Sequence, residues 1–278
     1  MKGGKVRRVS ATGIVRDALG KGMMVRMRIV CLLLLSLVWS SADAVEIVCH
    51  RAANASAPEN TRAAAQLCID WGVDYVEVDV RTSKDGVMYI LHDPTVDRTT
   101  NGHGILSQLT SSEIDALDAG SWFDPKFSGE RIPRIEPYLR WIKGKAKVYF
   151  DFKAGNIQKL VALVRELDME RECFFWFDNP LTVRAFRDIA PDIPLKINAY
   201  SIAEVEQAKR EFNAEIIECG LGNLSPEYVD TCRRNKIKIM VLEGGKNPEA
   251  FRKIIKWDVD MINLNHADLF IKVRDEMK

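Results

Sequence analysis

Residues 46–81 read EIVCHRAANASAPENTRAAAQLCIDWGVDYVEVDVR. Apolar runs at 45–49 and 75–80 predict two buried strands, because short apolar runs of this length are typical of strands covered on both faces. Between them, residues 61–71 have the spacing of an amphipathic helix. A strand, a helix and a strand in this order predict a βαβ unit with parallel strands.

The same alternation continues to the end of the chain. Further strands are predicted at 148–152, 173–177, 195–198, 215–218, 237–242 and 261–264, and further helices at 157–167, 181–189, 202–212, 226–235, 248–257 and 267–277. Eight strands alternating with helices predict an α/β fold, a (β/α)8 TIM barrel. The sequence shows no linker or internal repeat, so residues 45–278 are predicted to form a single domain.

One interval is longer than the others. A small insertion, at about residues 83–146, follows the second predicted strand and contains a predicted hairpin at 87–91 and a short predicted helix at 111–117. Loops that follow barrel strands lie on the face where barrel enzymes build their active sites. The insertion is therefore predicted to cover or wall the site.

The composition describes a folded protein without a general affinity for nucleic acid. The 278 residues are 47% hydrophobic and 28% charged, which excludes disordered and fibrous classes. The net charge of +1 hides an asymmetry: residues 1–44 hold eight basic and two acidic residues, which leaves 32 basic and 37 acidic residues, a net charge of about −5, in 45–278. A mildly acidic body lacks the basic surface of nucleic-acid binders.

The N-terminal segment has the pattern of a secretory signal peptide. Arg26 and Arg28 precede an apolar run at 29–39, and residues 42–44 read Ala-Asp-Ala. These features predict residues 1–44 to be an extension and signal peptide cleaved near Ala44, and hence a periplasmic or secreted protein. An apolar run of this length rises about 16 Å as a helix, far short of a bilayer core, so an uncleaved anchor is the weaker alternative and no stable membrane span is expected in the mature form.

The cysteines indicate no disulfide framework. Export would leave Cys49, Cys68, Cys173, Cys219 and Cys232, an odd number at irregular spacing with no C-x-x-C pair. This count disfavours a stapled scaffold and a zinc site, while a single disulfide remains open.

Polar residues close several predicted strands. His50 and Arg51 follow the first strand, and Glu77 and Asp79 lie two residues apart on the second, which places both carboxylates on one face. Two like charges on a buried face require compensation, and a divalent cation would provide it. Because all the candidate ligands are oxygen atoms, the sequence predicts one Ca²⁺ or Mg²⁺ ion.

Two further strand ends complete the predicted site. His92 follows the hairpin, and Asp151 and Lys153 lie two apart on the next barrel strand. In a parallel barrel these side chains meet at the carboxyl ends of the strands. Arg51 and Lys153 suit a phosphate group, and two histidines can act as general base and general acid. The combination predicts phosphodiester hydrolysis.

As an ordered set, these motifs resemble the glycerophosphodiester phosphodiesterase family. The matching residues are His50-Arg51-Ala52, Pro58-Glu59-Asn60-Thr61, Glu77-Val78-Asp79, Asp85-Gly86, His92-Asp93, Arg98-Thr99-Thr100, Gly102, Ile132-Pro133-Arg134-Ile135-Glu136 and Asp178-Asn179-Pro180. The resemblance covers residues 46–270. It implies a TIM barrel and metal-dependent hydrolysis of a small-molecule glycerophosphodiester to glycerol 3-phosphate and an alcohol.

The resemblance also implies roles for individual residues. His50 would accept a proton and His92 would donate one. The remaining implied or predicted site residues are Glu77, Asp79 and Asp151 as metal ligands, Arg51 and Lys153 at the phosphate, Glu59 and Asn60 lining or bracing the site, and Trp176 at the substrate. For Trp176, at the end of a predicted strand, ordinary packing is the alternative.

The chain departs from the family pattern at four places. Ala52 replaces the usual Gly, Asp151 replaces the usual Glu of the third metal ligand, Leu242-Glu243 replaces Trp-Thr, and residues 265–268 replace a Thr-Asp-x-Pro-like signature. The catalytic positions are kept while the later positions differ. This pattern favours an active enzyme, and it leaves open the leaving alcohol, the choice between Ca²⁺ and Mg²⁺, the oligomeric state, and whether water or a substrate hydroxyl attacks the phosphorus.

Two other functions compete with this interpretation. A phospholipase or lysophospholipase D-type phosphodiesterase would share the metal and histidine arrangement. A catalytically silent barrel that binds a ligand would not need both His50 and His92, nor the Glu77 and Asp79 pair, so their presence disfavours it.

Overall fold

The computed structural model describes Met1, residues 45–257 and residues 259–278, and the predicted signal peptide at about 26–44 lies outside these residues. Residues 45–278 form one compact unit.

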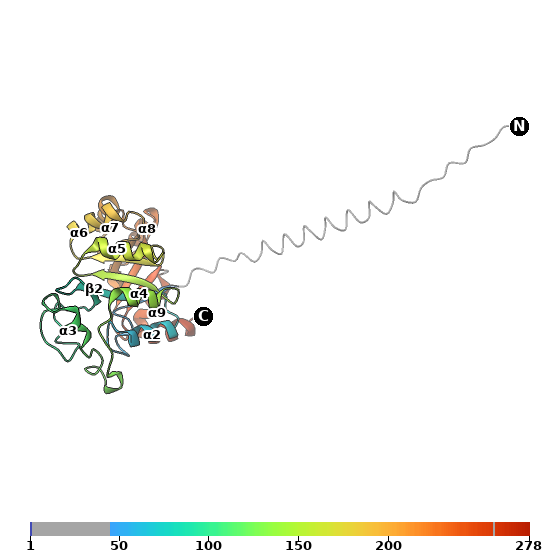
Figure 1. Cartoon of the computed structure of the whole chain (residues 1–278). Coiled ribbons are helices and arrows are strands. Elements are labelled where there is room, and N and C mark those ends of the chain that lie inside the picture. Colours follow the sequence, from blue (N-terminus) through green and yellow to red (C-terminus); the bar gives the residue numbers. More distant parts are fainter. Residues whose placement is uncertain (2–44, 258) are drawn as a thin grey trace. The chain divides into compact units, whose positions relative to one another are not determined.

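Eight parallel strands form the centre of this unit (Figure 1). They are β1 (Glu46–Cys49), β2 (Tyr75–Thr82), β4 (Lys147–Phe152), β5 (Cys173–Phe177), β6 (Lys196–Asn198), β7 (Ile216–Gly220), β8 (Lys238–Glu243) and β9 (Met261–Leu264). They pair in the order β5-β4-β2-β1-β9-β8-β7-β6, and a parallel bridge between Phe175 and Leu195 joins β5 to β6. The predicted (β/α)8 barrel is confirmed.

Helices alternate with these strands along the chain. They are α2 (Arg62–Asp70), α4 (Ile135–Ile142), α5 (Ile157–Glu166), α6 (Pro180–Ile189), α7 (Ile202–Phe212), α8 (Pro226–Arg234), α9 (Pro248–Lys256) and α10 (Ala267–Glu276). The sequence pattern did not predict α4, which is short and has Pro137 in its first turn. Proline is tolerated there because the first backbone N–H groups of a helix have no intrahelical acceptor.

Polar residues placed just before the helices explain where many of them begin. The capping side chains that accept a backbone N–H of the first turn are Thr61, Asn156, Asn179, Ser201, Ser225 and Asn247. Each such cap satisfies one of the orphan donors at a helix N-terminus and stabilises the helix by about 1 kcal/mol. These caps mark where the loops after the strands end.

The insertion after β2 has a small core of its own. Strand β3 (Met88–Ile90) pairs antiparallel with β2, as the predicted hairpin requires, and is followed by α3 (Ser111–Asp115) and two short 3-10 turns. The buried residues of this core are Tyr89, Leu91, Val96, Leu106, Ile114, Ala119 and Ile132. In Figure 1 the insertion, which includes α3, lies on the β2 side of the barrel.

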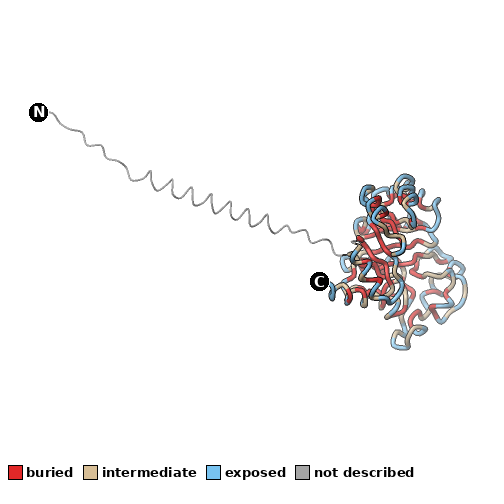
Figure 2. Tube along the Cα trace, turned by 180° about the vertical axis from the view of Figure 1, so that it is seen from behind, coloured by how far each residue is buried: buried red, intermediate tan, exposed pale blue. Residues whose placement is uncertain are grey.

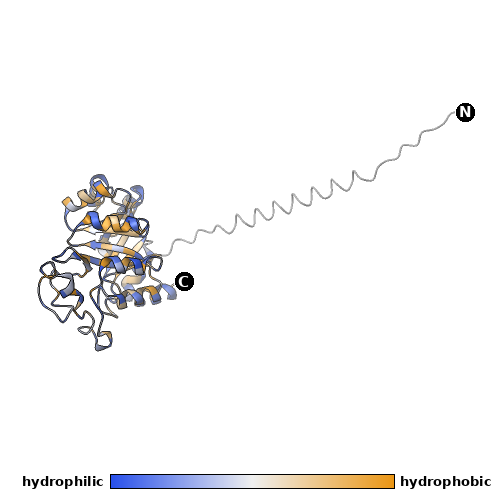
Figure 3. Cartoon of the chain, in the orientation of Figure 1, coloured by the Kyte–Doolittle hydropathy of each residue, from blue (hydrophilic) through white to orange (hydrophobic). Residues whose placement is uncertain are grey.

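Alternation along the strands produces two layers of core. Outward residues such as Ile47 and Val78 pack against the helices, whereas inward residues fill the barrel. The inward set is Val48, Tyr75, Tyr149, Phe174, Ile216, Met240 and Met261. The strands are accordingly the most buried elements in Figure 2, and helices such as α5 carry hydrophobic residues beside hydrophilic ones in Figure 3.

Two further sequence predictions concern membrane-spanning helices and disulfide bonds. Among the described residues, no helix is long and apolar enough to cross a membrane. The five cysteines in the described part of the chain are all buried and free.

Candidate active site

The inward rows of the barrel change from apolar to polar toward the carboxyl ends of the strands. On β2, Tyr75 is followed two and four residues later by Glu77 and Asp79, and on β4, Tyr149 is followed by Asp151. Alternate residues of a strand share a face, so the apolar floor and the polar site belong to the same rows. A cavity of about 150 Å³ lies among these groups, lined by His50, Glu77, Tyr149, Asp151, Trp176, Lys196, Asn198, Glu218, Leu242 and Asn263.

Three carboxylates form a cluster in this polar layer. Glu77, Asp79 and Asp151 each place an oxygen within 4.8 Å of the others, and Asp79 and Asp151 are direct register partners on β2 and β4. All three are at least 90% buried. Burial, followed by repulsion from Asp79 and Asp151, raises the pKa of Glu77 well above its usual value, and burial with the Asp79 charge raises the pKa of Asp151 to about 6. The cluster therefore holds more negative charge than its surroundings neutralise.

The residues of the cluster fit a divalent cation. Asp79 Oδ1 and Asp151 Oδ1 are buried and have no hydrogen-bond partner among the described residues. Lys153 Nζ donates a hydrogen bond to Asp151 Oδ2 at 2.6 Å and forms an ion pair, without hydrogen-bond geometry, with Asp79 Oδ1 at 3.3 Å, so its ammonium pairs with two of the three acids. Unsatisfied carboxylate oxygens are the ligands that Ca²⁺ and Mg²⁺ prefer. The shorter side chain at Asp151 still reaches the cluster.

The loop after β1 braces this cluster. The backbone N–H of Arg51 donates to Glu77 Oε2, and Asn60 Nδ2 donates to Asp79 Oδ2 at 2.7 Å. Arg51, Ala52 and Asn60 all have φ between 53° and 62°, a left-handed conformation that turns the loop sharply. The guanidinium of Arg51 lies 3.3 Å from Glu59 Oε1 and 3.9 Å from Asp79 Oδ2. Arg51, Glu59 and Asn60 thus lie together beside the acidic cluster.

His50 has a neutral partner that determines its tautomer. Its Nδ1 lies 2.9 Å from Asn265 Oδ1, which also accepts a hydrogen bond from Asn54 Nδ2 at 2.8 Å, while Asn265 Nδ2 donates to the carbonyl of Gly244. The amide oxygen therefore faces the ring, and Nδ1 carries the hydrogen. Burial lowers the pKa of His50. In the neutral ring with Nδ1 protonated, Nε2 is the acceptor nitrogen.

His92 has a charged partner instead. Its Nδ1 lies 2.8 Å from Asp93 Oδ1, and Asp93 is also bound by Arg98 Nε at 2.6 Å. The hydrogen bond from Arg98, with a smaller effect from His92, holds the pKa of Asp93 well below its usual range. Arg98 continues to Glu59, at 2.8 Å, so a chain of ion pairs joins His92 to Arg51 and the acidic cluster. The insertion is thus connected to the acidic cluster through these ion pairs, although none of its residues lines the 150 Å³ cavity.

Trp176 lies between two lysines at the end of β5. Its ring centroid is 5.3 Å from Lys153 Nζ and 4.9 Å from Lys196 Nζ, and the half-buried ring lines the cavity. All the residues predicted from the sequence are thus in or beside one site, His92 through the ion-pair chain.

Sequence analysis missed a second group of polar residues. Lys196, Glu218 and Asn263 line the cavity from β6, β7 and β9. Each is a polar residue inside a short buried strand. That signal, the same one that singled out Glu77 and Asp79, could have identified them.

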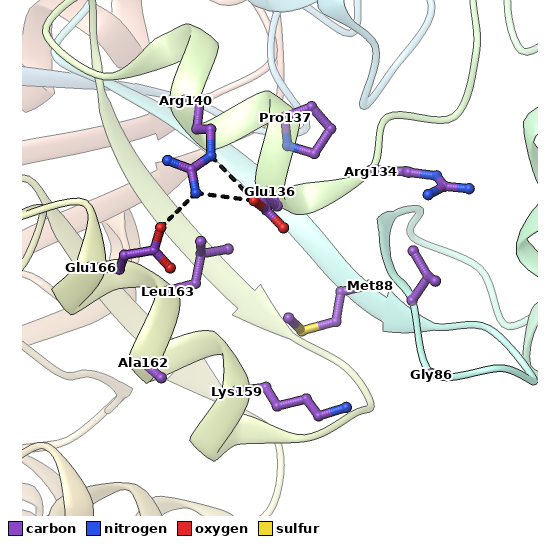
Figure 4. Close-up of a pocket in the computed structure, with 11 residues that line it drawn as sticks. Gly86, Met88, Arg134, Glu136, Pro137, Arg140, Lys159, Ala162, Leu163 and Glu166 are labelled. Atoms are coloured by element: carbon purple, nitrogen blue, oxygen red, sulfur yellow. Dashed lines mark hydrogen bonds and ion pairs between the residues drawn. The ribbon is translucent and has the colours of Figure 1, made fainter.

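A larger cavity, of about 700 Å³, lies on the outer wall, between α4, α5 and the turn before β3 (Figure 4). Its Arg140 is engaged by Glu136 at 3.0 Å and by Glu166 at 2.6 Å. It contains none of the groups predicted to do chemistry.

Comparison with known proteins agrees with this geometry. Residues 50–269 match the glycerophosphoryl diester phosphodiesterase family. The glycerophosphodiester phosphodiesterase of Caldanaerobacter subterraneus subsp. tengcongensis is 31% identical over 82% of this chain and 96% of that protein. The crystal structure of glycerophosphodiester phosphodiesterase from Agrobacterium tumefaciens str. C58 is 41% identical, with a TM-score of 0.78 over 82% of this chain and 99% of that chain.

A more distant solved structure shares the fold. It is that of an Oleispira antarctica phosphodiesterase in complex with the product sn-glycerol-3-phosphate. The two chains are 22% identical, with a TM-score of 0.75 over 83% of this chain and 96% of that chain.

Proposed function

Because this chain belongs to the glycerophosphoryl diester phosphodiesterase family and is a glycerophosphodiester phosphodiesterase, we propose that it uses one divalent cation and two histidines to release glycerol 3-phosphate and an alcohol. The observation that carries the proposal is the contrast between its histidines, since one has an amide partner and the other a carboxylate. The bound product of the Oleispira antarctica relative supports glycerol 3-phosphate as a product here.

Glu77, Asp79 and Asp151 would hold the cation, either Ca²⁺ or Mg²⁺. When bound, the cation supplies a positive charge that polarises a phosphoryl oxygen and offsets the carboxylates. Arg51 and Lys153 lie beside the same carboxylates and would bind the phosphate oxygens. Glu59 and Asn60 hold Arg51 and Asp79 in place through the contacts described above.

The two histidines divide the proton transfers. His50 Nε2 is unprotonated and accepts a proton from the attacking hydroxyl, whether of water or of the substrate. Oxygen attack forms one P–O bond and breaks the bond to the leaving alcohol, which takes a proton from His92. Attack by water gives glycerol 3-phosphate directly, whereas attack by a substrate hydroxyl gives a cyclic phosphate that a water molecule must then open to glycerol 3-phosphate. The Asp93 carboxylate contacts His92 Nδ1, whereas Asn265 presents an uncharged amide oxygen to His50 Nδ1.

We also propose that the protein is exported. The support is the basic, apolar and Ala-x-Ala pattern that ends at Ala44. Mass spectrometry of the mature protein from the native cell should give an N-terminus at Val45 in the periplasm or medium. A full-length cytosolic product would contradict export.

The catalytic proposal is tested by assaying the purified protein with glycerophosphocholine, glycerophosphoethanolamine, glycerophosphoglycerol and a lysophospholipid. Each substrate is measured after chelation and after addition of Ca²⁺ or Mg²⁺. We expect metal-dependent release of glycerol 3-phosphate from at least one soluble diester. Activity on the lysophospholipid alone would favour the lysophospholipase D-type alternative. No hydrolysis of any substrate would contradict the proposal.

The histidines are tested by substitution. His50→Ala and His92→Ala should each lower kcat by about 10²- to 10⁴-fold, the usual range for general acid or base catalysis. His103→Ala is the matched control, because His103 also pairs with an aspartate, Asp97 at 3.3 Å, while its side chain is 87% exposed in a loop. Full activity of either His50 or His92 variant would refute the paired mechanism.

A further inference from the structure

The catalytic proposal leaves one buried ion pair in the site without a role. Lys196 and Glu218 form it on the inner faces of β6 and β7, and both side chains line the cavity. Lys196 is 1% exposed and Glu218 is 6% exposed. In the strand order, β7 is four strands from β2, which carries Glu77 and Asp79, so the pair lies across the barrel from that part of the metal cluster.

The pair lies among groups that in other proteins bind the cationic group of a ligand. Lys196 Nζ lies 5.2 Å from the ring centroid of Tyr149 and 4.9 Å from that of Trp176. Two aromatic rings and a carboxylate are the groups that recognise choline and other ammonium ligands. Here the ammonium in the cage belongs to the protein itself.

The remaining hydrogen-bonding capacity is that of neutral amides. Asn198 Oδ1 accepts from Lys196 Nζ at 2.8 Å, and Asn263 Nδ2 donates to Glu218 Oε1 at 2.9 Å. Asn263 Oδ1 is buried and has no hydrogen-bond partner among the described residues. A hydroxyl group can donate to such an oxygen, whereas a quaternary ammonium cannot.

We propose that Lys196 is a specificity-determining residue that excludes diesters of choline and ethanolamine, so that the cavity selects a neutral, hydroxyl-bearing alcohol. The inference rests on the proposed diester hydrolysis at the same site. A second ammonium in the cavity would face Lys196 at close range with the Glu218 carboxylate already paired. A polyol such as glycerol meets no like charge and can donate a hydrogen bond to Asn263.

The experiment compares kcat/KM for glycerophosphoglycerol and glycerophosphocholine with the metal-loaded protein. We expect the unmodified enzyme to prefer glycerophosphoglycerol by about tenfold or more, a discrimination typical of one unfavourable buried contact. Lys196→Ala leaves the two rings and Glu218 facing an open space, so it should shift the ratio toward glycerophosphocholine by about tenfold or more. Lys196→Arg keeps the positive charge and should keep the preference.

Lys147 provides a matched control. Its Nζ lies 2.9 Å from Glu46 Oε1 and 4.8 Å from the ring centroid of Tyr75, the same combination of lysine, glutamate and tyrosine, but at the amino end of the strands. Lys147→Ala should leave the substrate ratio unchanged. A shift in this control equal to that of Lys196→Ala would overturn the proposal, because any lost lysine would then have the same effect.

A second variant guards against misfolding. Lys196→Ala leaves Glu218 buried without its cation, and Lys196→Ala/Glu218→Gln removes both charges together. The double variant should lose the exclusion of glycerophosphocholine but bind it less well than Lys196→Ala, because the carboxylate is gone. Titration calorimetry with choline chloride should detect binding to Lys196→Ala and none to the unmodified enzyme.

The outcomes separate the two proposals. The specificity role is overturned if the diesters are hydrolysed but the ratio changes less than about twofold in both Lys196→Ala and Lys196→Ala/Glu218→Gln, or if the unmodified enzyme prefers glycerophosphocholine. Failure of the unmodified enzyme to hydrolyse any diester with metal would instead refute the proposed function.

Discussion

The carboxylates at the two ends of the barrel differ in how many cations neutralise them. At the amino end, Glu46 is bound by two lysines, Lys147 at 2.9 Å and Lys238 at 2.7 Å. At the carboxyl end, Lys153 pairs with two of the three clustered carboxylates and Arg51 with one, and two carboxylate oxygens have no hydrogen-bond partner among the described residues. Glu46 therefore has two cations for one acid, whereas the cluster has three acids for two cations.

This difference in neutralisation has opposite consequences for the stability of the folded chain. A carboxylate surrounded by cations stabilises the folded chain, whereas clustered buried carboxylates destabilise it unless a cation binds. The pKa values follow this division. Burial acts to raise the pKa of Glu46, but the hydrogen bonds from Lys238 and Lys147 outweigh it and the pKa is lowered, while the pKa of Glu77 is raised well above its usual value.

The largest expected effect comes from removing a charge at the carboxyl end. Glu77→Gln should lower kcat by about 10²-fold or more, because a metal ligand is lost. The same change should raise the Tm of the metal-free protein by about 3 °C or more, since one of three like charges disappears and Gln still accepts the Arg51 N–H. Differential scanning fluorimetry with and without Ca²⁺ or Mg²⁺ measures both the rise and the expected loss of metal-induced stabilisation. A lower Tm of metal-free Glu77→Gln than of the metal-free parent would show that the clustered carboxylates do not destabilise the fold.

A substitution of Asn265 can give His50 a carboxylate partner like the one that His92 has in Asp93. Asn265→Asp places a carboxylate on Nδ1, which stabilises the imidazolium and raises the pKa of His50. Burial and Arg51 lower this pKa in the native site, while Asn265, Asp79 and Glu218 raise it. The base form is lost as the pH falls through the pKa, so a higher pKa should move the acid limb of kcat/KM upward by roughly one pH unit. Asn265→Ala, which adds no charge, should not move it upward, and an unchanged limb in Asn265→Asp would count against His50 as the base.

At the amino end the same kind of substitution should affect stability alone. Glu46→Gln should lower the free energy of unfolding by about 1 kcal/mol at pH 7, a small value because the lysines are about half exposed. The folded pKa of Glu46 is lowered, so its stabilisation is present above the unfolded value near 4.5 and is lost as the pH falls through the folded value. Urea unfolding at pH 7 and at pH 3 should therefore show a difference between variant and parent that shrinks in acid, with kcat unchanged. A difference that persists in acid would show that the charge is not its cause.

The smallest effect is expected at the loop that braces the cluster. Ala52 has φ of 62°, where a side chain is disfavoured and Gly is not. Ala52→Gly should stabilise the folded protein by at most about 1 kcal/mol, since the extra freedom of Gly in the unfolded chain offsets part of the gain. Ala52→Val should destabilise it instead. Equal stability of the Gly and Val variants would show that this conformation carries no strain.

Much of the fold follows from local pattern. Most barrel strands are short apolar runs, and six of the barrel helices follow a side chain that caps them, so the alternation could be read without tertiary information. Helix α4 escaped because it has only eight residues and carries Pro137 in its first turn. The candidate metal ligands were predictable for a related reason: Glu77, Asp79 and Asp151 are charges inside apolar strands, and a parallel barrel brings strand ends together.

The chain by itself determined which residues are available and on which face of a strand each one lies. Only the tertiary structure decided which residues distant in the sequence contact one another. Asn265 is 215 residues from His50, and Glu218 is 22 residues from Lys196 on a different strand, so no local spacing could join them. A hydrogen bond depends on atoms a few ångströms apart, and strand register sets that distance once the barrel closes. The sequence therefore predicted two histidines and an acidic cluster in one barrel, and closure of the barrel brought Asn265 to His50 and placed Lys196 beside two aromatic rings.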